Sequence, residues 1–121
     1  MTNTMSPEIR VVPKIKAHRG ASITAPENTA TAVRLAFQEG ADACEIDVRR
    51  SKDGAIVVFH DEDTNRIGGR NSLVAEQTLA ELRELDIGGW KSARYAGERI
   101  VTLAEIISFV PAGKTLFVEI K

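Results

Sequence analysis

The sequence predicts one α/β domain built on a parallel sheet, and three observations bear on that prediction. Segments with strand-like alternation and segments with helical periodicity follow one another in the order strand, helix, strand, helices, strand. The 121 residues are 43% apolar and 27% charged, which is typical of a single globular unit. No Gly-x-Gly-x-x-Gly run follows the first strand, which weakens the dinucleotide-binding version of the fold. An open doubly wound sheet and a (β/α)₈ barrel both remain compatible with this order.

The first half of the chain predicts a short strand followed by a helix. After a polar lead-in over residues 1–10, alternation predicts a strand at about 15–18. Residues 25–40 predict a helix, with Pro26 in its first turn and Gly40 in the left-handed conformation at its end. Its apolar residues recur at helical spacing, which predicts that one face is buried. That stripe consists of Val33, Ala36 and Phe37.

The second strand, over residues 43–48, carries opposite chemistry on its two faces. Alternation places Glu45 and Asp47 together on one face. The other face is apolar and consists of Cys44, Ile46 and Val48. The single cysteine has no partner for an internal disulfide, and its position predicts a small core residue.

Two later helices begin with the same tetrapeptide, Thr-Leu-Ala-Glu, at residues 78–81 and 102–105. This is a capping box, in which threonine and glutamate satisfy backbone donors at the helix start. Segments 61–78 and 88–101 contain glycines and polar residues and are predicted as loops. The expected buried positions of the two helices are Leu79, Leu82 and Leu85 in the first, and Leu103, Ile106, Ile107 and Val110 in the second.

The segment after the second strand predicts a hairpin. Eight residues separate Val48 from Val57, whereas a parallel crossover needs about a dozen. Asp53-Gly54 is a favoured two-residue turn. Counting back from that turn pairs Lys52 with Ala55, Arg49 with Val58, and Asp47 with His60. We therefore expect the hairpin to return His60 to the strand face that bears the two carboxylates.

Further charged residues occur where strands end. His18 and Arg19 close the first strand, and the last strand, residues 115–121, places Glu119 and Lys121 on the face opposite its apolar residues. The carboxyl ends of parallel strands converge in α/β folds. Taken singly, each histidine or cation is most simply a solvated side chain, and the two acids are most simply an exposed pair. Their combination at strand ends indicates a catalytic or metal-binding site. Neighbouring carboxylates repel each other, and an oxygen-preferring divalent cation, Mg²⁺ or Ca²⁺, removes that cost. The three acids, two histidines, arginine and lysine together suit a phosphate ester as substrate, because a metal and the cations neutralise its charge while the imidazoles transfer protons.

Composition excludes some classes of partner. The formal net charge is -1, which gives no electrostatic basis for binding nucleic acid or an anionic membrane surface. No apolar run has the length of a signal peptide or of a membrane span. We therefore expect no membrane insertion and a cytoplasmic location.

Five motifs give the chain a family resemblance. They are His-Arg-Gly (18–20), Pro-Glu-Asn-Thr (26–29), Glu-x-Asp (45–47), Asp-Gly followed by His-Asp (53–61), and Glu-x-Lys (119–121). In this order they closely resemble the N-terminal part of glycerophosphodiester phosphodiesterases. The resemblance implies a TIM (β/α)₈ barrel, of which residues 1–121 would supply about three strands, a β-hairpin and helices. It also implies metal-dependent hydrolysis of glycerophosphodiesters to glycerol 3-phosphate and an alcohol.

The resemblance also implies residue roles. His18 and His60 would be the catalytic acid–base pair, and Glu45, Asp47 and Glu119 would bind the divalent metal, Mg²⁺ or Ca²⁺. Arg19 and Lys121 would hold the substrate phosphate. Glu27 and Asn28 would support the pocket rather than take part in chemistry.

The chain departs from the family pattern in two places. The last helix begins Val-Thr-Leu-Ala-Glu where the family often has Pro-Thr-Leu-Glu, and we expect no functional consequence. The sequence also ends at Lys121, with three barrel strands where closure needs eight. We therefore expect a domain truncated after Lys121 that needs the missing C-terminal barrel portion or self-association. Two alternatives stay open: hydrolysis of a related phosphodiester, such as a lysophospholipid or a sugar phosphodiester, or an inactive fragment that only binds metal or a partner.

Overall fold

The structure, a computed structural model, describes residues 15–121. The lead-in expected over residues 1–10 lies outside this range. The helices and strands, in chain order, are β1 (Lys16–His18), α1 (Ala30–Gln38), β2 (Ala43–Arg50), β3 (Ile56–Val58), β4 (Asp63–Thr64), α2 (Asn65–Gly68), β5 (Arg70–Leu73), the 3₁₀ turn η2 (Val74–Glu76), α3 (Leu79–Leu82), the 3₁₀ turn η3 (Ala93–Tyr95), α4 (Leu103–Ile107) and β6 (Thr115–Ile120).

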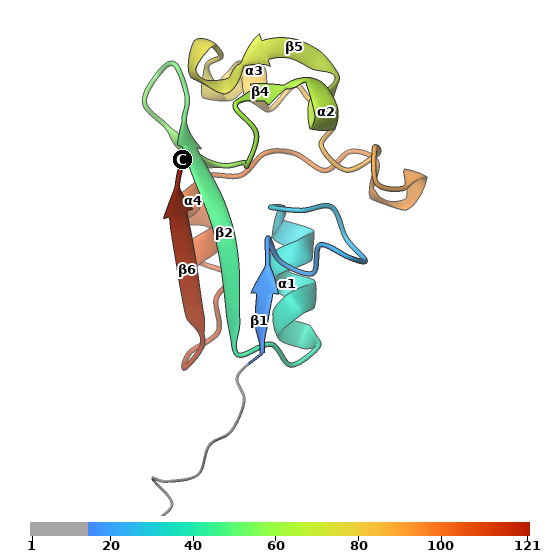
Figure 1. Ribbon diagram of the computed structural model, residues 1–121, viewed down its shortest axis with the longest axis vertical. Helices are drawn as coiled ribbons and strands as arrows, with labels where there is room; N and C mark the ends of the chain where they lie inside the picture. The colour runs from blue at the N-terminus through green and yellow to red at the C-terminus, as the bar shows by residue number, and fades with distance from the viewer. Residues whose placement is uncertain (1–14) are drawn as a thin grey trace, which may run out of the picture.

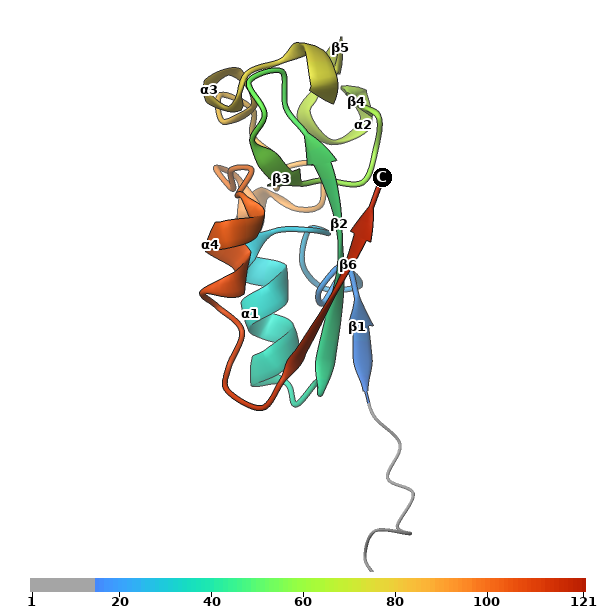
Figure 2. The same ribbon diagram turned by 90° about the vertical axis from the view of Figure 1, so that its left-hand side faces the viewer.

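The central strand of the main sheet is β2, which pairs with β1 and β6 in parallel and with β3 in antiparallel orientation. Figure 1 shows β1 and β6 on either side of β2. In the turned view, α1 and α4 both lie on one face of this sheet (Figure 2). Within residues 15–121, no helix covers the opposite face.

Two hydrophobic cores stabilise the molecule. One lies between the main sheet and the helices α1 and α4, and its fully buried members are Val33, Cys44, Ile46, Val48, Val58 and Ile106. The other lies among the segments that follow β3, and its members include Val57, Phe59, Ile67, Val74, Leu82, Leu85, Ile87 and Ile100. Neighbouring residues of β3 contribute to different cores, so this short strand joins the sheet to the upper part of the molecule (Figure 2).

The predicted apolar face of β2 is confirmed, because Cys44, Ile46 and Val48 are all buried in the first core. The start of the first helix was predicted wrongly. Pro26 does not lie in the first turn, since α1 begins at Ala30 and Thr29 is its N-cap residue, with its hydroxyl accepting from the Ala32 N–H at 3.0 Å. The hydroxyl cap outweighs the preference of proline for a helix start. Gly40 ends the helix with φ +97°, as predicted.

The hairpin forms, but its register differs by one residue from the prediction. The observed pairs are Val48 with Val58, Arg49 with Val57, and Arg50 with Ile56. The Ser51 N–H donates to the carbonyl of Ala55 at 2.9 Å, so residues 52–54 form a three-residue loop, with Gly54 at φ +85°. Phe59, not His60, lies opposite Asp47 and donates its N–H to the Asp47 carbonyl at 2.9 Å. The strand β3 ends at Val58, so His60 lies beyond the ladder.

The second half of the chain matches the sequence in its helix starts and differs in its loops. Both capping boxes are present, at Thr78–Glu81 and Thr102–Glu105. The segment 61–78, predicted as a loop, contains the two-stranded sheet β4–β5, the short helix α2 and the 3₁₀ turn η2. Ile107 was predicted to be buried but is exposed. It is the last residue of α4, and its neighbour Ile106 is the one that lies in the core. Among residues 15–121 no helix has the length and apolarity needed to cross a membrane.

Candidate active site

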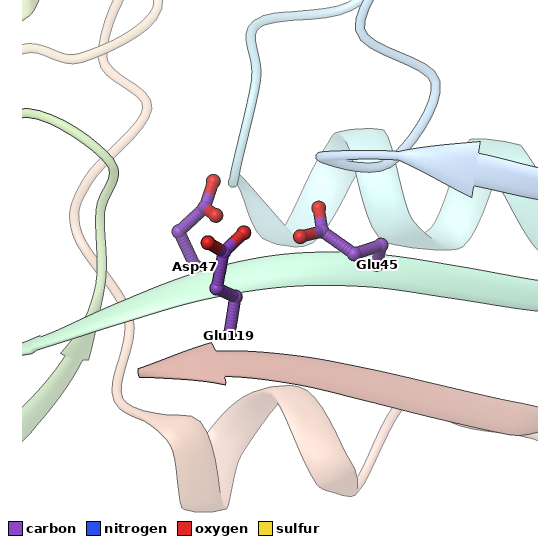
Figure 3. A group of neighbouring side chains, drawn as sticks. All are labelled: Glu45, Asp47 and Glu119. Atoms are coloured by element: carbon purple, nitrogen blue, oxygen red, sulfur yellow. The ribbon is translucent and has the colours of Figure 1, made fainter. Parts of the chain in front are cut away.

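Three carboxylates meet on the uncovered face of the main sheet. The parallel register places Asp47 of β2 directly beside Glu119 of β6. Glu45 lies two residues before Asp47, so it projects from the same face of β2. One ligand oxygen from each of the three side chains lies within 4.8 Å of the others. Figure 3 shows the three carboxylates turned toward one another.

The carboxylates leave polar atoms unpaired where they are most buried. Among residues 15–121, the buried side-chain polar atoms without a hydrogen-bond partner are Arg19 Nε, Glu45 Oε1 and Asp47 Oδ1, and all three belong to this cluster. Buried polar atoms without partners are costly. An oxygen-preferring divalent cation would satisfy both carboxylate atoms, so the residues fit such a group.

The environment shifts two of the three acids in opposite directions. Burial, followed by the nearby charge of Asp47, raises the pKa of Glu45. The hydrogen bond and the charge of Lys121 lower the pKa of Glu119. The Lys121 ammonium lies 3.1 Å from Glu119 Oε2. Acidification therefore protonates Glu45 before Glu119, and the cluster loses part of its negative charge.

The turn after β1 brings a histidine and an arginine to the cluster. The register of β1 and β2 places His18 beside Glu45, with His18 Nε2 3.6 Å from Glu45 Oε1. Arg19 forms an ion pair with Asp47, with Nε 3.3 Å from Oδ2. Gly20 allows the chain to turn against α1, because a Cβ at this position would lie 2.7 Å from Ala32 Cβ. The turn thus fixes both side chains at the carboxyl end of β1.

The Pro-Glu-Asn-Thr segment contacts the site through hydrogen bonds made by Glu27 and Asn28. Thr29 caps α1, and Asn28 is buried with φ +57°. The amide of Asn28 donates to Asp47 Oδ2, and its carbonyl oxygen accepts the Asp47 N–H, both at 3.1 Å. Glu27 Oε2 lies 3.3 Å from Arg19 Nη1. These contacts support the prediction that Glu27 and Asn28 position other residues.

His60 reaches the site by an indirect route. Within residues 15–121, no hydrogen bond or ion pair joins His60 to the three carboxylates. Its Nδ1 lies 2.8 Å from Asp61 Oδ1, and Arg49 Nε donates to its carbonyl at 2.9 Å. Asp61 in turn forms an ion pair with Arg66, with Arg66 Nε 2.8 Å from Asp61 Oδ2.

The structure thus connects six of the seven predicted site residues by direct contacts and adds residues to which the sequence analysis gave no role. The six are His18, Arg19, Glu45, Asp47, Glu119 and Lys121. The additional residues are Arg49, Asp61 and Arg66. A signal for Arg49 existed, because its parity in β2 matches that of Glu45 and Asp47. Arg66 carried no such signal, since it lies in a segment predicted as a loop.

A family model described as the glycerophosphoryl diester phosphodiesterase family matches residues 18–121. A curated relative named glycerophosphodiester phosphodiesterase, from Caldanaerobacter subterraneus, is 44% identical over 94 residues, which cover 78% of this chain and 39% of the relative. The chain therefore spans less than half the length of that relative.

Solved structures give the same result. A phosphodiesterase from Oleispira antarctica, in complex with the product sn-glycerol-3-phosphate, matches with TM-score 0.86 and 44% identity over 90% of this chain and 44% of its own. A glycerophosphodiester phosphodiesterase from Agrobacterium tumefaciens matches with TM-score 0.86 and 38% identity over 90% of this chain and 47% of its own. These matches confirm the predicted fold class, the N-terminal portion of a (β/α)₈ barrel.

Proposed function

The chain belongs to the glycerophosphoryl diester phosphodiesterase family, and on that premise we propose that it supplies the reaction centre of an enzyme that hydrolyses glycerophosphodiesters to glycerol 3-phosphate and an alcohol. The observation that carries the proposal is the carboxylate cluster, which leaves two buried oxygens unpaired and contacts a histidine, an arginine and a lysine on one sheet face. The product complex of the Oleispira relative supports the choice of substrate.

In this proposal the acids hold a cation and the bases act on the ester. Glu45, Asp47 and Glu119 would bind one Mg²⁺ or Ca²⁺ ion, as oxygen donors suit either metal. When bound, the ion would neutralise negative charge on the phosphate during the reaction. Arg19 and Lys121 would bind the phosphate oxygens through charge-assisted hydrogen bonds.

The two imidazoles would transfer protons on either side of phosphorus. We propose that the free glycerol hydroxyl next to the ester attacks phosphorus, while one histidine accepts its proton and the other donates a proton to the departing alcohol. The new phosphorus–oxygen bond gives a cyclic phosphate, which water then opens with the two histidines in exchanged roles. Detection of cyclic glycerophosphate after rapid quenching supports this route, and its absence favours direct attack by water.

The pocket needs more than residues 15–121. Phe117, Val118 and Ile120 of β6 are exposed, and Ile120 is 84% accessible. Exposed apolar strands of this kind are covered by further strands in a closed barrel. We propose that a C-terminal barrel portion, or a second copy of the chain, covers them and completes the pocket. The small-molecule substrate is then the main partner, and the cytoplasmic location stays a prediction.

The decisive experiment compares this chain with a longer version of the protein that includes the rest of the barrel. Each is assayed for glycerol 3-phosphate release from glycerophosphocholine with Mg²⁺ or Ca²⁺, and again with a chelator. We expect metal-dependent release, strongest in the longer version. Glu45→Ala should weaken metal binding and activity together, whereas His60→Ala should stop turnover and leave metal binding intact.

Other results would select the alternatives. Activity on a lysophospholipid or a sugar phosphodiester, with none on glycerophosphocholine, would indicate a related phosphodiester as substrate. Metal binding without hydrolysis in either length would indicate a fragment that only binds metal or a partner. Full activity in the His60→Ala variant would remove His60 from the proton-transfer role.

A further inference from the structure

Arg66 occupies a position that the proposed mechanism does not use. It lies in α2, and its guanidinium makes two contacts to each of two acids. Toward Asp61, its Nε and Nη2 lie 2.8 and 3.1 Å from the two carboxylate oxygens. Toward Glu27, its Nη1 and Nη2 lie 3.3 and 3.0 Å from the two oxygens. The guanidinium therefore bridges two segments that are 39 residues apart in sequence.

Each of these acids also contacts a proposed reaction-centre residue, through an oxygen that Arg66 Nη2 contacts as well. Asp61 Oδ1 lies 2.8 Å from His60 Nδ1, and Glu27 Oε2 lies 3.3 Å from Arg19 Nη1. Arg19 in turn pairs with Asp47. The result is a continuous chain of charged contacts from the imidazole of His60 to the carboxylate cluster. Arg66 is its central member.

A surface ion pair ordinarily contributes little, so the geometry has to show more than charge pairing. The Arg66 side chain is 46% exposed, but its partners Glu27 and Asp61 are only 12% and 21% exposed. Planar two-point contacts to carboxylates restrict orientation as well as distance. The hydrogen bond from Arg66 is also the main reason that the pKa of Asp61 falls to about 2. Asp61 therefore remains an ionised acceptor for the His60 ring.

We propose that Arg66 is a positioning residue that holds Asp61 and Glu27 in a fixed relation and so orients the His60 imidazole and the Arg19 guanidinium. An ionised Asp61 at Nδ1 selects the ring tautomer with its hydrogen on Nδ1. Nε2 is then the nitrogen that accepts a proton. The predicted tautomer of the His60 ring does not depend on the proposed function, whereas the predicted effect of Arg66 on turnover rests on it.

The first test observes the ring directly. The chain has two histidines, so ¹⁵N spectra of the imidazole nitrogens contain one signal set for His60 and an internal reference from His18. At about pH 8, well above the pKa of a free imidazole, we expect the Nδ1–H form for His60. Arg66→Met should convert it to a mixture with the Nε2–H form, and His18 should not change. Arg83→Met is the matched control, because Arg83 pairs with Glu105 away from this chain of contacts.

A second variant guards against loss of folding. Arg66→Lys keeps the charge but has a single nitrogen in place of the planar fork, so we expect a partial shift of the His60 tautomer at unchanged thermal stability. If His60 keeps the Nδ1–H form in both Arg66 variants, the proposal is wrong, whatever the activity.

The third test uses the version of the protein that proves active on glycerophosphocholine. Arg66→Met should lower kcat by about 10- to 100-fold, as loss of an orienting partner does, with a smaller change in KM. Equal losses in Arg66→Met and Arg83→Met would overturn the positioning role. Absence of activity in the unmodified protein would contradict the proposed function, while the ring spectra would still decide the role of Arg66.

Discussion

The two faces of β2 are built for different purposes from alternate residues of the same strand. On one face, Ile46 is fully buried against the two helices, and its neighbours are apolar. On the other face, Glu45 and Asp47 hold buried oxygens that lack hydrogen-bond partners. The apolar face gains free energy from burial, whereas the acidic face loses free energy through repulsion and desolvation.

The contrast teaches where stability and function reside in this chain. The helix side of β2 is packed in a hydrophobic core, so changes there should act on folding. The acidic side is strained by its own charges, so a bound cation should relieve it. Predictions that separate the two faces therefore test the whole interpretation.

The largest expected effect is on the apolar face. Ile46→Ala should lower the free energy of unfolding by about 2–5 kcal/mol, because it removes a fully buried side chain and leaves a cavity. Urea denaturation followed by circular dichroism measures this change. The metal affinity of the folded fraction should stay the same, and a matching loss of affinity would show that the two faces are coupled.

The next effect concerns the acidic face. Saturating Mg²⁺ or Ca²⁺, at about a hundred times its dissociation constant, should stabilise the protein by about 2.7 kcal/mol. Glu45→Gln should abolish most of this gain, and without metal it should leave stability equal or higher, because it removes a carboxylate from a repulsive cluster. Glu84→Gln, an exposed member of the Arg70 ion pair, is the control and should retain the gain. Melting curves with and without metal give both values.

The stabilisation by metal should also depend on pH. The pKa of Glu45 is raised, so its proton competes with the cation, and this competition grows as the pH falls. Without metal, the stability of the fold should change with pH in the opposite direction. A raised carboxyl pKa favours the folded state at low pH, and that contribution is lost as the pH rises through the folded pKa. The rise in melting temperature that the metal causes should therefore become smaller as the pH is lowered from about 7 to about 5. A shift that is constant over this range would mean that Glu45 is not a ligand.

The smallest expected effect on stability concerns the N-cap of α4, on the helix side of the sheet. Thr102→Ala removes the capping hydroxyl of α4, which accepts the Glu105 N–H at 3.2 Å, and should cost about 1 kcal/mol. Because α4 packs on the apolar face through Ile106, this variant should unfold more easily and bind metal normally. Thr78→Ala in α3 is a matched control in the other core, and calorimetry compares the two.

Local patterns predicted much of the fold because they depend on neighbouring residues. Alternation placed the acids and the apolar residues of β2 on the correct faces, and the two capping boxes start α3 and α4. The hairpin register could not be obtained in this way, since Asp53-Gly54 suits a two-residue and a three-residue loop equally well. The longer loop is seen in the structure from the hydrogen bond of the Ser51 N–H to the Ala55 carbonyl.

The candidate site shows the same limit. The grouping of Glu45, Asp47 and Glu119 follows from strand parity and parallel pairing, both visible in the sequence. The bridge made by Arg66 does not, because it depends on how a loop folds over the sheet and meets a residue 39 positions earlier. The roles of the three acids in metal binding and of Arg66 in positioning stay predictions.

One feature, the left-handed backbone at Asn28, restricts how this position can vary. Asparagine tolerates φ +57°, and its side chain satisfies both the N–H and a carboxylate oxygen of Asp47. Glycine would accept the backbone angle but remove both hydrogen bonds to Asp47. Aspartate would place a second negative charge against the first, and glutamine is a poor choice for this conformation. A saturation library at codon 28 should therefore return a single amino acid, because two independent demands intersect there.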